Sequence, residues 1–317
     1  MQNKNLFVFG SLLILSGCFG GSSSGSSSGN GLSVALTPEN AATAAQLSMA
    51  APKAVSGLLE GMIEDVPDEV FTDIETRTTN RMAGIAAAMA PTREEEACSH
   101  GGKVIVEESD TTFTITLENC TETESVAATD TTPAYSSTDI SNGSITFSDS
   151  TMDGYPDAES VTIDLRESFT DTLGKEENST EKGSFVTGYS DTGYAIKNMN
   201  MSTRYWGRDS VNSPVYDYTI AAQDFNVVID ATTDQQTFSG IVTATGTDEE
   251  GDAMLGGSFR VDTVAPINND QTQGEYKITG AGNSSVITRL DPAGIYVEIN
   301  GASVEFHAWD DVDDYFD

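Results

Sequence analysis

The alternation of hydrophobic and polar positions divides the chain into a short part with helical spacing and a longer part with strand spacing. Residues 37–51 are rich in Ala, and a stripe of apolar residues then recurs at the spacing of one helix face: Val55, Leu58, Leu59, Met62 and Ile63. The run Thr37-Pro38-Glu39 is typical of a helix start, and Pro91 would end the last helix. We therefore expect a small α-helical segment within residues 34–93.

From Cys98 onward the apolar residues recur at every second position. In FTITLEN, residues 113–119, the apolar side chains alternate with threonines, and the same pattern recurs in GSITFS, SVTIDL, YDYTIA, FNVVID, SFRVDT, EYKITG and IYVEIN. Asn142-Gly143 and Asn300-Gly301 are typical of the turns between such strands. The pattern predicts a mainly β domain over residues 94–317. We expect one large antiparallel sheet, curved or barrel-like, with a β-sandwich as the second choice.

The first eighteen residues carry a pattern that belongs to export rather than to the fold. Residues 6–15 are apolar, too short a run for a membrane-spanning helix, which needs about 20 residues. They end in LSGC, residues 15–18, which resembles the lipobox of bacterial lipoproteins. The resemblance implies that residues 1–17 are a signal peptide, and that Cys18 receives a diacylglyceryl thioether and a fatty acyl group on its new amine. Two or more chains give stable anchoring.

The residues after Cys18 predict a flexible tether. Residues 18–33 are mostly Gly and Ser, which offer no side chains to bury. Lipoproteins retained in the inner membrane usually carry Asp after the cysteine, whereas this chain carries Phe19. The resemblance therefore implies lipid anchoring in the outer membrane, on either its periplasmic or its surface face.

The charge of the chain narrows the choice of partners. Its 50 acidic residues face 15 basic ones, and removal of residues 1–17 takes away Lys4 and no acid, which leaves a net charge near −36. Such a chain repels nucleic acid and anionic headgroups, so we expect no nucleic-acid partner and contact with the membrane only through the lipid anchor. A salty habitat would also account for the charge. An envelope protein or a glycan remains a possible partner.

Two residue sets suggest chemistry in the β domain. Apart from Cys18, the cysteines are Cys98 and Cys120, and in an exported protein two cysteines predict one disulfide.

The run DSTMDGYPDAES, residues 149–160, resembles part of the acidic calcium loops of extracellular repeats. Calcium binds clustered carboxylate oxygens. The candidate ligands are Asp149, Asp153, Asp157 and Glu159, with a solvated acidic loop as the alternative.

No pattern in the sequence identifies a reaction. The two histidines, His100 and His307, lie outside hydrolase motifs, and with 50 acidic residues an acid pair is uninformative. TRYWGRD, residues 203–209, places Trp206 between two arginines. The motif fits either a sugar or anion contact or a strand end in which Trp206 is buried and the arginines pair with surrounding acids. Residues from Gly256 to the end resemble the C-terminal repeats of uncharacterised Gram-negative lipoproteins, which brings no activity.

The sequence therefore favours a non-catalytic binding or structural component of the envelope. A carrier of a lipid or other apolar ligand and an envelope hydrolase are the alternatives. The hydrolase would need a histidine or a converging acid pair in a concave site with a shifted pKa.

Overall fold

A computed structural model of the chain describes residues 32–45, 47–48 and 92–308, with gaps at 110, 130–131, 149–157, 191, 249–250 and 269–271. The signal peptide, the lipobox cysteine and the part of the expected helical segment from residue 49 to Pro91 lie outside the described residues. Their structure stays a prediction.

Within these residues the chain forms fifteen β-strands in one antiparallel sheet. The strands are β1 (Thr92–Ala97), β2 (Lys103–Glu108), β3 (Thr112–Val126), β4 (Tyr135–Ser148), β5 (Ala158–Asp171), β6 (Glu176–Ser190), β7 (Gly193–Arg208), β8 (Tyr216–Asp230), β9 (Gln235–Thr247), β10 (Gly257–Ala265), β11 (Ile267–Asn268), β12 (Gly274–Thr279), β13 (Ser285–Asp291), β14 (Gly294–Ile299) and β15 (Ala302–Ala308).

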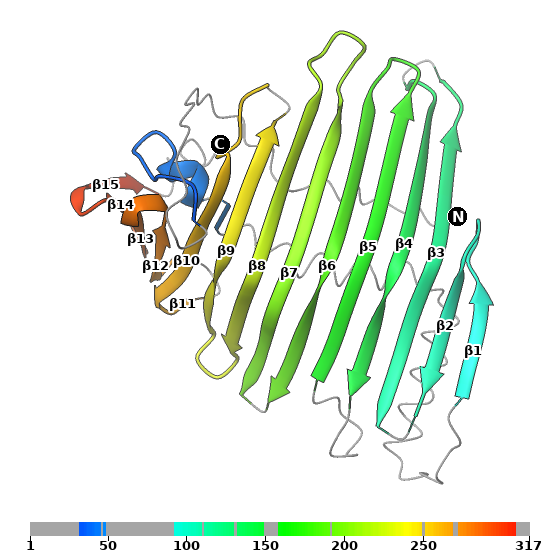
Figure 1. Ribbon diagram of the computed structural model, residues 1–317, viewed down its shortest axis with the longest axis horizontal. Helices are drawn as coiled ribbons and strands as arrows, with labels where there is room; N and C mark the ends of the chain where they lie inside the picture. Colours follow the sequence, from blue (N-terminus) through cyan, green and yellow to red (C-terminus); the bar gives the residue numbers. More distant parts are fainter. Residues whose placement is uncertain are drawn as a thin grey trace.

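The strands follow one another in chain order across the sheet, and only the short β11 leaves this path by pairing with β9. The sheet does not close, because β1 and β15 each pair with a single neighbour. The long strands β3–β9 form a broad twisted surface, and β12–β15 turn away from it at one end (Figure 1). The expectation of a large, curved antiparallel sheet is confirmed, in its open form.

The two faces of the sheet differ in composition because side chains alternate along each strand. One face, which we call the inner face, carries the buried apolar residues, among them Ile163, Phe185 and Phe225. The opposite face, which we call the outer face, carries mainly hydroxyl and paired charged side chains. This division matches the alternation that the sequence predicts.

The residues just before the helical segment are built into the sheet. Ser33 and Val34 donate backbone hydrogen bonds to the carbonyl of Ser258 on β10, at 3.0 and 3.2 Å. Leu36 is buried in the main core, beside the same end of the sheet. A short helix follows at residues 41–45 and also packs into that core. The described residues contain no helix long and apolar enough to cross a membrane.

A hydrogen-bonded turn lies between Thr37 and the start of the helix. The Asn40 side-chain oxygen accepts a hydrogen bond from the Thr37 backbone N–H at 2.8 Å. Residues 38–40 form this turn, and the helix starts at Ala41. The expected helical segment is present in this short form, and its remainder lies outside the described residues.

Bulges in the long strands are stabilised by asparagine side chains. Asn198 and Asp224 have positive φ angles of 54° and 48°, and each donates its backbone N–H to the side-chain oxygen of an asparagine on the adjacent strand. A bulge adds twist and bends its strand. These positions therefore contribute to the curvature of the sheet.

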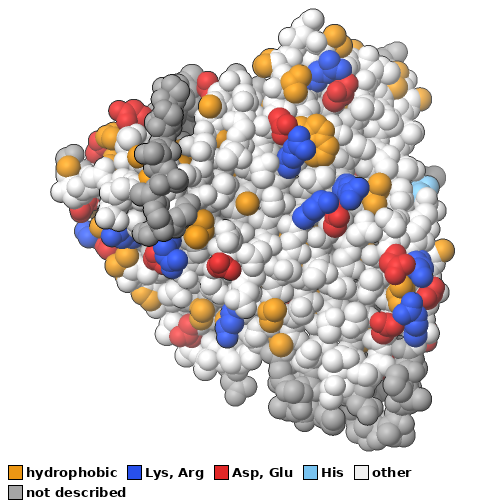
Figure 2. Space-filling view, viewed as in Figure 1, with side chains coloured by type: hydrophobic (Ala, Val, Ile, Leu, Met, Phe, Trp, Pro, Cys, Tyr) orange, Lys and Arg blue, Asp and Glu red, His pale blue; other side chains and the backbone are white. Residues whose placement is uncertain are grey.

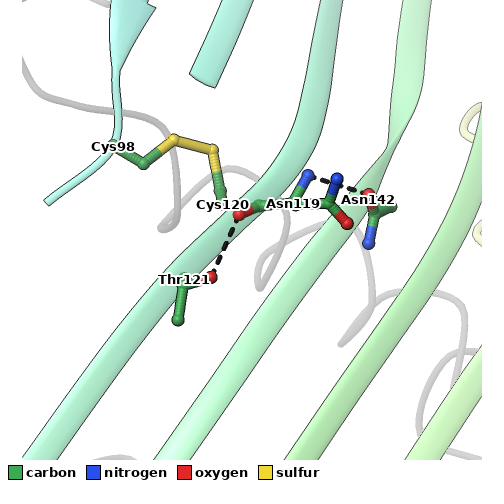
Figure 3. The surroundings of a disulfide bond; sticks show 5 residues. All are labelled: Cys98, Asn119, Cys120, Thr121 and Asn142. Atoms are coloured by element: carbon green, nitrogen blue, oxygen red, sulfur yellow. Dashed lines mark hydrogen bonds between the residues drawn. A yellow bond between two sulfur atoms is a disulfide. The ribbon is translucent and has the colours of Figure 1, made fainter. Parts of the chain in front are cut away.

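The predicted disulfide is present in the structure. Cys98 follows β1 and Cys120 lies on β3, with their Cα atoms 5.4 Å apart, and the bond ties the first hairpin to the third strand (Figure 3). Beside it, Asn119 donates its backbone N–H to the side chain of Asn142 on β4 at 2.8 Å. Cys120 also belongs to a small apolar cluster with Val104 and Leu117. The disulfide thus ties β1 and β3 together at one edge of the sheet, beside a small apolar cluster that is separate from the main core.

Candidate functional site

The predicted calcium ligands lie mostly outside the described residues. Asp149, Asp153 and Asp157 fall within the gap at 149–157, so their arrangement stays a prediction. Glu159 is the second residue of β5, and its carboxylate accepts a hydrogen bond from the Tyr189 hydroxyl at 2.5 Å. Among the described residues, no three His, Cys, Asp or Glu side chains form a group that could hold a metal ion.

The arginines of TRYWGRD are paired on the outer face. Arg204 donates two hydrogen bonds to Asp217, at 2.8 and 2.7 Å, and its guanidinium lies 4.9 Å from the ring centre of Trp206. Arg208 donates a hydrogen bond to Glu176 at 2.5 Å. Of the two interpretations of this motif, the structure supports the strand end with paired arginines.

The rest of the outer face is uncharged over large areas. Most of the surface in Figure 2 is neither apolar nor charged, and the charges lie in small groups of both signs. Hydroxyls on neighbouring strands bind one another, as in the pairs Thr114–Thr146 at 3.1 Å and Ser144–Thr162 at 2.9 Å. These hydroxyls satisfy each other and do not converge on a ligand position.

The two histidines do not form a catalytic group with each other. His100 is exposed in the turn between β1 and β2, whereas His307 is on β15 at the other edge of the sheet. The His307 Nε2 atom lies 3.9 Å from a Glu305 carboxylate oxygen. A hydrolase site built on both histidines has no geometric support.

A group of polar side chains on the inner face is the best candidate for a site. Glu167 on β5 lies opposite Ser179 on β6, which lies opposite Tyr205 on β7, which lies opposite Tyr218 on β8. Glu181 is two residues along β6 from Ser179 and therefore on the same face. We call these five residues, Glu167, Ser179, Glu181, Tyr205 and Tyr218, the carboxylate–tyrosine site.

Two pairs of side chains in this site are in contact. The Ser179 hydroxyl donates a hydrogen bond to Glu167 at 3.1 Å, and the rings of Tyr205 and Tyr218 have their centres 5.2 Å apart. Ser179 is buried, the two tyrosines are partly buried and Glu167 is exposed. The site therefore has a buried base and an exposed rim at Glu167.

Electrostatics distinguish Glu181 from the other acids on the strands. Burial, and then the nearby charge of Glu167, raise the pKa of Glu181 from its ordinary 4.5 to about 7. Burial, and then the charge of Glu181, raise the pKa of Tyr205, so its hydroxyl stays protonated. Strongly shifted pKa values cluster at functional sites, although structural groups produce them too.

Sequence reasoning missed this site because no short motif contains it. Its members come from four strands, and only their register brings them together. The one available signal was the period of two, which puts Glu181 on the same face of its strand as Phe185. An acid at an apolar position of a strand marks a buried carboxyl.

The arrangement can bind hydroxyl-bearing or cationic groups. The carboxyls accept hydrogen bonds, Glu181 also donates one when protonated, and the tyrosine rings offer flat apolar surface. A comparison of the chain with known protein families, with curated proteins and with solved structures finds no match.

Proposed function

We propose that this protein is a lipoprotein of the outer membrane, anchored through Cys18, that binds an uncharged glycan of the envelope without transforming it. The lipobox resemblance and the Gly/Ser tether support the anchor. The observation that carries the binding function is the row of two tyrosine rings beside Glu167 and Glu181 on the inner face.

The chemistry of the site fits a sugar better than an apolar ligand. Sugar rings stack their C–H faces on aromatic rings, and carboxyl groups bind pairs of sugar hydroxyls. An apolar ligand would displace water from Glu167 and Glu181 without offering either carboxyl a hydrogen bond, which costs free energy. The large negative charge of the chain would repel an acidic polysaccharide, so the glycan is uncharged.

Replacing the lipobox cysteine tests the anchor. With Cys18→Ser, the protein should leave the membrane fraction or retain residues 1–17, because the acylated sulfur is missing. Membrane fractionation and the mass of the N-terminal peptide measure both effects. Correct processing together with full retention in the outer membrane would contradict the anchor.

Calorimetric titration with the hexamer of N-acetylglucosamine tests the binding function. We expect saturable binding by the wild type and about fivefold weaker binding after Tyr205→Leu or Glu167→Gln, since each removes a contact worth about 1 kcal/mol. Tyr296→Leu is the matched control. Tyr296 on β14 contacts Phe306 on β15, and both strands lie away from the site. An unchanged affinity in both site variants would refute the proposal.

A glycan hydrolase is the second candidate, and the raised pKa of Glu181 favours it. Glycosidases use one protonated and one ionised carboxyl, roles that Glu181 and Glu167 would fill. The same titration separates the two functions. Recovery of intact hexamer after prolonged incubation supports binding alone, whereas shorter oligomers that disappear with Glu181→Gln establish hydrolysis.

A further inference from the structure

A second polar group lies on the inner face, at the opposite ends of the same strands. Glu159 on β5 is paired in register with Thr187 on β6, and Tyr189 on β6 is paired with Tyr194 on β7. All four side chains point to the inner face, because they share the alternation of the core residues Val161, Phe185 and Ile196.

Glu159 is a buried acid with no cationic neighbour in the part of the chain that the structure describes. Glu159 is only 5% exposed. Among the described side chains, the hydrogen bond from the Tyr189 hydroxyl is its one polar contact. The Lys and Arg residues described on β4–β8 all occupy outer-face positions: Arg166, Lys182, Lys197, Arg204 and Arg208. A buried carboxylate needs a compensating charge or several donors.

Thr187 provides an independent sign that a partner belongs here. Thr187 is 3% exposed, and its hydroxyl has no hydrogen-bond partner within the described part of the chain. Residues paired directly across two strands have Cβ atoms about 5 Å apart, so this hydroxyl lies beside the Glu159 carboxylate. Buried polar atoms are normally satisfied, and one left unpaired points to a missing group.

The tyrosines complete the chemistry and leave the group open to solvent. Tyr189 and Tyr194 are 43% and 39% exposed, with ring centres 6.4 Å apart. The faces of the two tyrosine rings can attract a cation, and the Tyr189 hydroxyl already donates a hydrogen bond to Glu159. A ligand would therefore enter past the two rings and meet acceptors at the base.

From these contacts we propose that Glu159, Thr187, Tyr189 and Tyr194 form a binding site for a primary alkylammonium group. The ammonium N–H donors would bind the Glu159 carboxylate and the Thr187 hydroxyl, and its charge would face the two rings. The site has no residue in common with the carboxylate–tyrosine site, so it does not depend on the proposed glycan binding.

Calorimetric titration of the full mature protein with putrescine, at constant ionic strength, tests the site. We expect saturable binding by the wild type, at least tenfold weaker binding with Glu159→Gln, and several-fold weaker binding with Thr187→Val. Thr187→Val should keep or raise the melting temperature, because it removes an unpaired buried hydroxyl. It therefore tests the site even if Glu159→Gln folds poorly.

Glu122→Gln is the matched control, because Glu122 is an exposed acid on β3 and its replacement removes the same charge. We expect it to bind putrescine as tightly as the wild type. An equal loss in Glu122→Gln would overturn the proposal, since it would show diffuse attraction to an acidic chain. Absence of saturable binding by the wild type, or unchanged affinity in both site variants, would also overturn it.

Discussion

Replacing Glu181 by Gln should stabilise the protein by about 3 kcal/mol at pH 8 and leave its stability nearly unchanged at pH 4. The pKa of Glu181 rises from 4.5 to about 7 on folding, chiefly through burial. Between these values the folded protein binds the proton more tightly than the unfolded chain, so the wild type loses stability as the pH rises. Each pKa unit corresponds to 1.36 kcal/mol. Urea unfolding at a series of pH values measures the difference.

Two further variants show whether the neighbouring charge contributes. In a Glu167→Gln background the like charge beside Glu181 is absent, so the stabilisation by Glu181→Gln should be smaller and should level off at a lower pH. Glu122 is an exposed residue of β3. The stability of Glu122→Gln should therefore change with pH in parallel with that of the wild type. A constant difference between Glu181→Gln and the wild type from pH 4 to pH 8 would contradict a buried carboxyl at this position.

Loss of the Cys98–Cys120 disulfide should destabilise the first hairpin by about 3 kcal/mol. The bond closes a loop between residues separated by 22 positions, and in the chain-entropy picture a loop of this length contributes about that much. The strands β1 and β2 lie at one edge of the sheet, and β2 contributes Val104 to the small apolar cluster around Cys120. We therefore expect Cys98→Ala with Cys120→Ala to speed amide exchange mainly in β1 and β2.

The reduced wild type is the matched control for this variant. With reductant present, wild type and double variant should exchange alike, because neither then has the bond. Exchange in β12–β15, at the other edge, should stay unchanged. Equal protection of β1 and β2 in the oxidised wild type and the double variant would show that the bond does not hold the edge.

The fold class could be predicted because one face of the sheet is buried. Alternating segments such as FTITLEN and SVTIDL lie within β3 and β5, and Asn300-Gly301 is the turn before β15. Strand ends were less predictable. YDYTIA and FNVVID are one strand, β8, interrupted only by a bulge. The sequence pattern does not distinguish a bulge from a turn, since both interrupt the alternation.

The predicted turn at Asn142-Gly143 was wrong. Both residues lie inside β4, where a Cβ on Gly143 would come within 2.2 Å of the Thr162 carbonyl oxygen on β5. Gly143 is therefore needed for close approach of two strands rather than for chain reversal. The pair Asn142-Gly143 alone does not predict this close approach, because the constraint comes from β5, which begins fifteen residues after Gly143.

The sites depended on register and were predicted less well than the fold. The disulfide was predicted from the number of cysteines in a chain expected to be exported. The carboxylate–tyrosine site was missed, because pairing of four strands assembles it and bulges in β7 and β8 shift that pairing. With so many acids in the chain, composition did not distinguish Glu181 from its solvated neighbours.

Fluorine NMR of protein labelled with fluorotyrosine and fluorotryptophan tests the central claim most directly, because Tyr205 and Trp206 are adjacent on β7 and point to opposite faces. On titration with the N-acetylglucosamine hexamer, we expect saturable shifts of the Tyr205 and Tyr218 signals and an unchanged Trp206 signal. Shifts at Trp206 without shifts at the two tyrosines, or no shifts at all, would contradict glycan binding on the inner face.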